Sequence, residues 1–101
     1  MIALSALAFL RNPEQLAELR GSTDPKLFVN TVEEMLRYLT IVQNGLRRVA
    51  VEDIRIGDKE IKAGDGVVFA INAANRDEGA FPDSPDEVDI HRLARHHVAF
   101  G

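Results

Sequence analysis

The sequence has no cysteine among its 101 residues. This excludes disulfides and thiolate metal sites within the chain, and it is compatible with a reducing cytosol. A run of about 20 apolar residues, as a membrane-spanning helix needs, is also missing. The apolar start, residues 1–10, lacks the positively charged region and the cleavage pattern of a signal peptide. We therefore expect a cytoplasmic protein in which this start is a buried helical segment.

Positive charge is scarce as well. The chain has 12 Lys and Arg against 16 Asp and Glu, a net charge of -4. Binding to nucleic acid or to an anionic membrane needs a basic face. We therefore predict neither partner, and a small molecule or another protein instead. Since the chain has no P-loop, dinucleotide glycine motif or Ser/His/Asp nucleophile signature, we assign no catalytic residue.

Three histidines, His91, His96 and His97, raise the possibility of a metal site, because neutral imidazoles are frequent metal ligands. Adjacent histidines do not normally face one ion together, however, and no third ligand stands at a recognisable spacing. We predict no metal site among them.

Two helix starts can be read from the first 40 residues. Asn12 and Pro13, with Gln15 at the third helical position, predict a helix that ends near Gly21. Asp24-Pro25 repeats the start signal before a helix with a strong apolar face. The apolar positions of that face are Leu27, Phe28, Val32, Met35 and Leu36.

Short β-rich pieces follow, and then an irregular tail. The pieces at 48–51, 54–56, 60–62 and 67–71 predict one small sheet with tight turns, and the apolar run 67–71 predicts a strand covered on both faces. A short helical turn and a meander are expected after Asn72. The predicted fold class is α+β, a single partial domain of helices over about 1–38, sheet over about 46–71 and meander over about 72–101. A chain this small buries little surface, so exposed apolar side chains are expected.

Glu34 and Arg37 lie three residues apart, on one face of the predicted helix. A solvated surface ion pair is one interpretation, and such pairs are common and contribute little. The other is a buried pair, because the helix is so apolar; a buried carboxylate needs several donors, and a second guanidinium from elsewhere could complete them.

Several short motifs gain specificity from their order along the chain. They are Met1-Ile2-Ala3-Leu4, Asn12-Pro13-Glu14-Gln15, Glu34-x-x-Arg37, Ala74-Asn75-Arg76-Asp77, Phe81-Pro82-Asp83 and His97-Val98-Ala99-Phe100-Gly101. In this order they resemble the C-terminal third of a soluble bacterial cytochrome P450, of the actinobacterial type. The resemblance covers essentially the whole chain and reaches the opening of the family's haem loop, just before its ligand cysteine.

The resemblance implies roles for particular residues. Glu34, Arg37 and Arg92 match a structural triad behind haem. Arg48 matches an arginine that binds a haem propionate, although two solvated bases near a strand edge would explain Arg47 and Arg48 equally well. Phe100 and Gly101 open the haem loop, and Arg76 is expected to organise the meander.

The segment after the long helix is the implied substrate wall. Ile41, Val42 and Gln43 match positions that border the pocket above haem, and an apolar wall with one amide suits a bulky, mostly hydrophobic substrate. Without the resemblance the same segment is simply a connector with a glycine turn.

The complete protein is then expected to be a haem-thiolate monooxygenase that receives electrons from a ferredoxin-type donor. The isolated chain is expected to be inactive, because it has no cysteine to ligate iron. The alternative is a gene remnant or a non-catalytic α+β module that binds another chain through exposed apolar surface. A module should be monodisperse and melt cooperatively, whereas part of a larger fold should aggregate or melt broadly.

Overall fold

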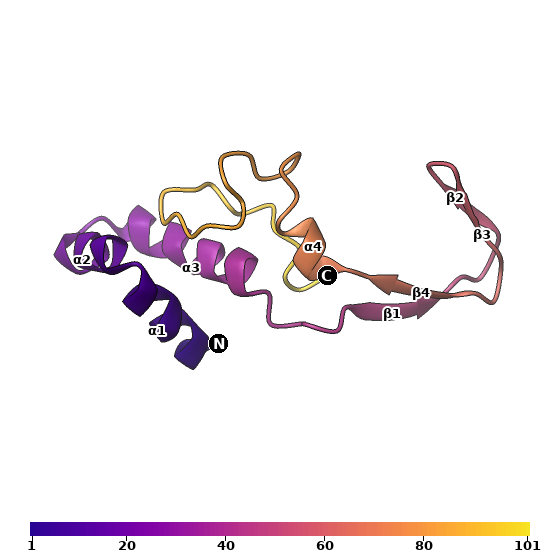
Figure 1. Cartoon of the computed structure of the whole chain (residues 1–101), viewed down its shortest axis with the longest axis horizontal. Coiled ribbons are helices and arrows are strands. Elements are labelled where there is room, and N and C mark those ends of the chain that lie inside the picture. The colour runs from indigo at the N-terminus through magenta and orange to yellow at the C-terminus, as the bar shows by residue number, and fades with distance from the viewer.

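A computed structural model describes all 101 residues as an elongated molecule with principal extents of 53 × 25 × 22 Å. Figure 1 shows the helices and the C-terminal meander gathered at one end, and a narrow β arm extending from them. The apolar start is helical as expected, but the expectation that it is buried is wrong, because Ile2 and Leu10 are 88% and 71% exposed. The elements are α1 (Ile2–Arg11), α2 (Pro13–Gly21), α3 (Pro25–Leu39), β1 (Leu46–Val49), β2 (Ile54–Ile56), β3 (Lys59–Ile61), β4 (Gly66–Phe69) and α4 (Ile71–Ala74). None of the helices combines the length and apolar character needed to cross a membrane.

The start and end of α3 have clear local causes. Asp24 caps the helix, since its Oδ1 accepts a hydrogen bond from the Lys26 backbone N–H at 2.9 Å, and Pro25 takes the first helical position. At the other end Thr40 adopts a left-handed conformation with φ 39°, which is unusual for a β-branched residue. Its hydroxyl donates to the Arg37 carbonyl at 2.7 Å and helps to hold this conformation.

α2 starts where it was predicted, but the side chain of its N-cap residue, Asn12, makes no hydrogen bond to the helix that it precedes. The Asn12 side chain donates back to the Ala8 carbonyl at 2.8 Å and so closes the end of α1. Gln15 binds the distant meander, donating to the Val88 carbonyl at 2.8 Å and accepting from the Ile90 N–H at 2.9 Å. Its amide pairs with that backbone as a neighbouring strand would, because the backbone there has no other partner.

The longest helix, α3, buries a polar face. Glu34 and Arg37 are fully buried, whereas Phe28 and Val32 are 44% and 57% exposed. The predicted apolar face therefore contributes mainly Met35 to the small core with Ala8 and Val88, while the meander covers the charged face. The pattern of apolar residues identified the helix correctly but did not show which face is buried.

The strands form two separate two-stranded antiparallel ladders, so the prediction of a single sheet is wrong. β1 pairs with β4 from Leu46 opposite Phe69 to Val49 opposite Gly66, and β2 pairs with β3 at the tip. The expected burial of both faces of the last strand is also wrong: Val68 and Phe69 are 59% and 51% exposed, because β1 and β4 pack mainly on each other.

After α4 the chain forms the irregular meander expected from its Asn, Asp, Gly and Pro content. Figure 1 shows it passing along α3, and the Asn30 side chain fixes it there by donating to the Ile90 carbonyl at 2.7 Å. Helices, small β ladders and a meander confirm the α+β class.

Candidate functional site

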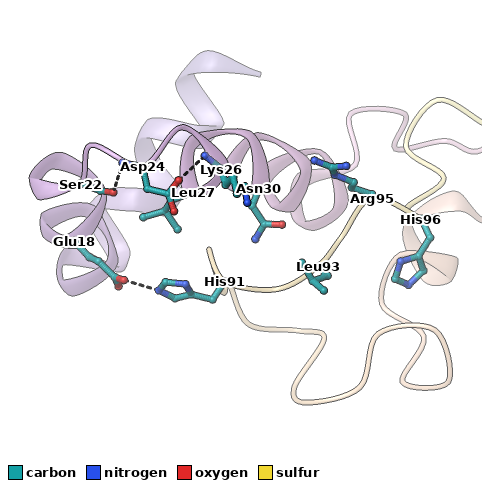
Figure 2. Close-up of a pocket in the computed structure, with 10 residues that line it drawn as sticks. All are labelled: Glu18, Ser22, Asp24, Lys26, Leu27, Asn30, His91, Leu93, Arg95 and His96. Atoms are coloured by element: carbon teal, nitrogen blue, oxygen red, sulfur yellow. Dashed lines mark hydrogen bonds and ion pairs between the residues drawn. The ribbon is translucent and has the colours of Figure 1, made fainter.

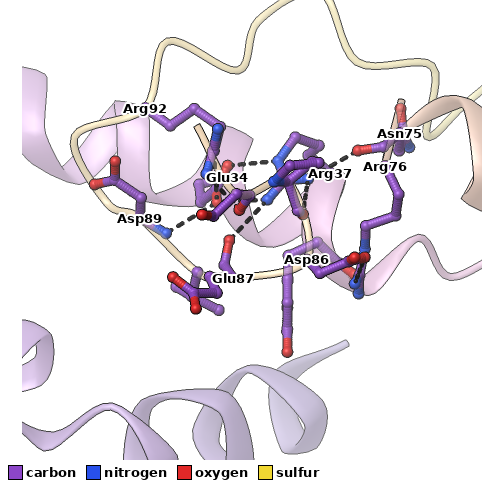
Figure 3. Close-up of polar contacts among 12 residues, drawn as sticks. Glu34, Arg37, Asn75, Arg76, Asp86, Glu87, Asp89 and Arg92 are labelled. Carbon is purple, nitrogen blue, oxygen red and sulfur yellow. Dashed lines mark hydrogen bonds and ion pairs between the residues drawn. The ribbon is translucent and has the colours of Figure 1, made fainter. Parts of the chain in front are cut away.

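Arg37 stands at the centre of a buried polar network between α3 and the meander (Figure 3). Its Nε and Nη2 donate to the two carboxylate oxygens of Glu34, at 2.8 and 2.7 Å. The remaining donors reach the backbone carbonyls of Asn75, Pro85 and Glu87, at 2.8, 2.7 and 3.2 Å. All five guanidinium N–H groups are thus used, which is what a fully buried arginine requires.

Glu34 is equally well satisfied. In addition to the two bonds from Arg37, its Oε1 accepts from the Asp89 backbone N–H at 3.0 Å and from Arg92 Nε at 3.3 Å. The side chains of Glu34 and Arg37 are completely buried, and that of Arg92 is 8% exposed. The surface ion pair is therefore excluded for this structure, and the second guanidinium comes from the meander.

Arg92 also holds a strained turn. Its Nη1 donates to the Pro82 carbonyl at 2.6 Å, and its Nη2 donates to those of Asp83 and Ser84, at 2.9 and 3.1 Å. Asp83 and Ser84 both have positive φ, 64° and 58°, which is unfavourable for residues with a Cβ. Because three carbonyls converge on one guanidinium, Arg92 stabilises a turn that the local sequence alone would not favour.

Asn75 and Arg76 extend the network, and the spacing of motifs did not reveal how. The fully buried Asn75 side chain donates to Thr40 Oγ1 at 3.0 Å and accepts from the Val98 N–H at 2.8 Å. Arg76 lies over the Tyr38 ring, donates to the Tyr38 carbonyl at 2.9 Å and pairs with Asp86 at 3.0 Å. Arg76 thus joins α3 to the meander.

A cavity of about 430 Å³ opens between the base of the β arm, α4 and the C-terminal turn. Its lining is mostly apolar and contains two of the residues implied by the resemblance: Leu46, Arg48, Phe69, Ala70, Ile71, Ala74, Val98 and Gly101. The third, Phe100, is 81% exposed and does not line it. Gly101 fits closely, since its φ is 101° and a Cβ there would lie 2.8 Å from Leu46 Cδ1.

Arg48 reaches this cavity as its only charged lining residue. Its Nη1 donates to the Arg47 carbonyl at 2.8 Å, and no carboxylate of the chain pairs with it. An apolar cavity with one guanidinium free of acidic partners can receive an apolar ligand that carries an anionic group.

The three residues implied as a substrate wall do not form a pocket together. Gln43 donates through Nε2 to the Leu39 and Thr40 carbonyls, at 2.9 and 2.6 Å, and so caps the end of α3. It lines a shallow cavity of about 330 Å³, to which neither Ile41 nor Val42 contributes. Ile41 is 47% exposed.

The largest hollow, about 940 Å³, lies between the α2–α3 junction and the meander (Figure 2). It is open and mostly polar, and His91 there pairs with Glu18 across its edge. His96 lines the same hollow but is held elsewhere, stacked on the Phe81 ring with centroids 4.3 Å apart. A mixed set of acids and bases dispersed around an open hollow does not define one ligand.

His97 contributes to the C-terminal turn. Its Nδ1 accepts from the Ala99 N–H at 3.2 Å, so the ring proton lies on Nε2, which donates to Glu33 Oε2 at 2.8 Å. This contact ties the turn to α3 a second time, and nothing in the sequence spacing indicated it.

Comparison with known proteins gives this geometry its context. The profile of the cytochrome P450 family matches residues 17–99. The chain belongs to the cytochrome P450 family. Its recognition from ordered short motifs is thereby confirmed.

Bacterial P450s match the chain over nearly its full length. Cytochrome P450 GfsF of Streptomyces halstedii is 64% identical over 100% of the chain and 25% of its own length. Its crystal structure covers 97% of the chain and 26% of that protein at a TM-score of 0.93.

Two further P450s have names that state an activity. The mycinamicin VIII C21 methyl hydroxylase of Micromonospora griseorubida, solved with mycinamicin VIII bound, covers 97% of the chain and 24% of its own chain at 51% identity and a TM-score of 0.88. The 20-oxo-5-O-mycaminosyltylactone 23-monooxygenase of Streptomyces fradiae is 50% identical over 100% of the chain and 23% of its own length. The chain thus spans about a quarter of the length of the relatives it matches.

Proposed function

We propose that this chain is the part of a haem-thiolate monooxygenase that anchors one edge of haem and fixes the loop leading to its ligand. The observation that carries the proposal is the cavity that Arg48 lines together with Val98 and Gly101 of the turn 98–101. The buried charge network binds the same turn through Asn75, which accepts from Arg37 and from the Val98 N–H. Family membership supports haem as the cofactor of the complete protein.

The residues around the cavity fit one edge of a porphyrin. Apolar side chains from β1, β4 and α4 would contact the macrocycle, and Arg48 would bind a propionate through its directed guanidinium donors. When bound, haem with a thiolate ligand supplies oxygen activation, one atom entering the substrate and the other leaving as water. The cysteine would come from outside these residues, which contain none.

Glu34, Arg37 and Arg92 act structurally in this proposal. All three side chains are nearly or fully buried. The two arginines donate to backbone carbonyls, and Glu34 accepts from both arginines and from the Asp89 N–H, so none is available to transfer a proton to a substrate. Their role is to hold the meander against α3, and through it the turn at Val98.

The substrate is proposed to be a hydrophobic organic molecule, contacted by Ile41, Val42 and Gln43. Ile41 is exposed, and Gln43 keeps its Oε1 free while both N–H groups cap α3. Similarity to enzymes named for the hydroxylation of mycinamicin and of a tylactone supports a bulky substrate of this kind. Electrons are proposed to come from a ferredoxin-type donor.

The proposal is tested with the complete protein encoded around this segment. We expect it to bind haem stoichiometrically, and its reduced carbon monoxide complex to show a thiolate-type absorption spectrum. The isolated chain should show neither property. A complete protein that binds no haem, or binds it with a histidine-type spectrum, would contradict the proposal.

The alternative, a non-catalytic interaction module, is motivated by the exposed apolar residues of the arm, such as Val49 and Val68. Sedimentation and thermal unfolding of the isolated chain discriminate between the two. A monodisperse chain with one cooperative transition would favour the module, and aggregation or a broad transition would favour part of a larger enzyme.

A further inference from the structure

We propose that Asn75 is a positioning residue that sets the place of the turn 98–101, and thereby the part of the cavity wall formed by Val98 and Gly101. The inference rests on the proposed function, because the cavity is taken as the haem edge. It assigns a role to a side chain outside the Glu34, Arg37 and Arg92 network and outside the cavity lining.

The contacts of Asn75 join three distant parts of the chain. Its Nδ2 donates to Thr40 Oγ1, 35 residues away at the end of α3, and its Oδ1 accepts from the Val98 N–H, 23 residues ahead. Its carbonyl accepts from Arg37 Nη1 at 2.8 Å, as Figure 3 shows. A residue that only closed a local turn would not need partners at these separations.

The environment of Asn75 makes its contacts specific. The residue is completely buried, and no buried side-chain polar atom in the chain lacks a hydrogen-bond partner. An apolar replacement would leave the Val98 N–H without its acceptor, and a buried donor without a partner is costly. The fully buried site also leaves no room for the turn to shift without repacking.

The turn that Asn75 holds forms part of the cavity. Val98 and Gly101 line it, and the turn closes with a hydrogen bond from the Gly101 N–H to the Val98 carbonyl at 2.9 Å. Gly101 lies so close to Leu46 that a Cβ would be 2.8 Å from its Cδ1. Moving the Val98 backbone would therefore move part of the wall of the cavity that Arg48 also lines.

Thr40 offers a second way to test the role of Asn75. It does not contact the turn, yet its hydroxyl is the acceptor for the Asn75 side chain and donates to the Arg37 carbonyl. Thr40→Val removes both hydrogen bonds with almost no change of shape, and Thr40→Ser retains both. An effect of Thr40→Val on Val98 that Thr40→Ser lacks passes through the hydroxyl's bonds to Asn75 or to the Arg37 carbonyl, and Arg37 itself binds Asn75.

The experiment uses the complete holoprotein with Asn75→Ala, Thr40→Val and Thr40→Ser. Asn72→Ala is the matched control, because Asn72 lies in the short helix that Asn75 caps, but is exposed and binds only the Ala73 N–H. Three quantities are measured: the amide hydrogen exchange rate of Val98, the rate of haem transfer to an acceptor protein, and the position of the haem absorption band.

We expect Asn75→Ala to accelerate Val98 exchange and haem transfer by about tenfold, the size of a lost buried hydrogen bond. Thr40→Val should accelerate both by about threefold. Both variants should shift the haem absorption band, and in the same direction as each other. Thr40→Ser and Asn72→Ala should match wild type.

The inference is overturned if Val98 exchange and the absorption band are unchanged in Asn75→Ala, or, where that variant fails to fold, if Thr40→Val matches Thr40→Ser. The proposed function fails separately, and visibly, if the wild-type complete protein binds no haem. Loss of haem in every variant together with Asn72→Ala would also overturn the inference, since it would show no role specific to Asn75.

Discussion

The body of the molecule, formed by α1 to α4 and the meander, differs from the hairpin arm, residues 46–69, in which side chains find partners within the chain. The body buries charge and gives every donor of Arg37 a partner inside the chain. The arm exposes apolar side chains, among them Val49, Val68 and Phe69, and beyond its base, where Leu46 lies beside Gly101, its strands pack mainly on each other. The buried charges of the body are satisfied within the chain, whereas the apolar side chains of the arm have no covering layer in it.

This difference has a physical basis. A buried charge is tolerated only when its partners are fixed, so the network must be satisfied within the body itself. Apolar burial is not directional and can be completed by any well-shaped surface. The chain spans about a quarter of the length of the relatives it matches, and under the proposed function the arm packs against further polypeptide and haem.

The largest expected effect comes from removing the carboxylate at the centre of the body. Glu34→Ala leaves two buried guanidinium groups without their shared acceptor, which should lower the free energy of unfolding of the complete protein by about 3–5 kcal/mol. Urea denaturation measures the loss. Glu60→Ala is the control, because Glu60 pairs with Lys62 on the exposed tip of the arm and should cost at most about 1 kcal/mol. Equal losses would erase the contrast between body and arm.

The next effect concerns the strained turn. Arg92→Lys keeps the charge but cannot reach three carbonyls in the directed way of a guanidinium, so we expect a loss of about 1–3 kcal/mol. Limited proteolysis should also cleave faster near Asp83 and Ser84. Arg95→Lys, at an exposed arginine without an ion pair, is the comparison. Unchanged stability and cleavage in Arg92→Lys would mean that the turn at Asp83 and Ser84 is stable without the Arg92 guanidinium.

Replacing Arg48 tests whether the arm binds haem, not how much the arm contributes to stability. Arg48→Ala in the complete protein should accelerate haem loss about tenfold, equivalent to one charge-assisted hydrogen bond. Stability without haem should change little, because Arg48 is exposed and forms no ion pair. Arg47→Ala is the matched control on the neighbouring position of β1. If the two variants lose haem equally, Arg48 is only a solvated base.

The smallest effect addresses the arm's apolar face. Val68→Ser should destabilise the complete protein by about 1 kcal/mol, since we expect the remaining polypeptide to cover this side chain. Val51→Ser, at a 92% exposed position outside the strands, is the comparison and should stay within about 0.5 kcal/mol of wild type. A Val68 variant as stable as the Val51 variant would show that the arm is free in solution.

The sequence predicted elements well where the determining signal is local. Pro13, Asp24-Pro25 and the alternation of β pieces with Gly turns placed nearly every helix and strand within a few residues. It failed where a distant partner decides, as for Gln15, whose amide binds backbone more than 70 residues ahead. The coverage of 67–71 was wrong because burial of a strand depends on neighbours that periodicity cannot identify.

The candidate site was predictable in part for the same reason. Glu34 and Arg37 share a helix face, so their contact follows from spacing alone, and Arg92 entered through the resemblance. Asn75 and His97 were missed as contacts because their partners, Thr40, Val98 and Glu33, are brought near only by the folded meander. A buried amide near the end of a short helix has no distinctive sequence pattern.

The central claim, that a buried charge network joins α3 to the meander, is tested most directly by a double-mutant cycle between Glu34 and Arg92. Glu34→Gln, Arg92→Lys and the double variant are compared with the wild-type complete protein by urea unfolding. We expect a coupling energy of about 1 kcal/mol or more, because Arg92 Nε donates to Glu34 Oε1 in a buried site. Losses that add within about 0.3 kcal/mol would show that the contact seen in Figure 3 does not join these elements energetically.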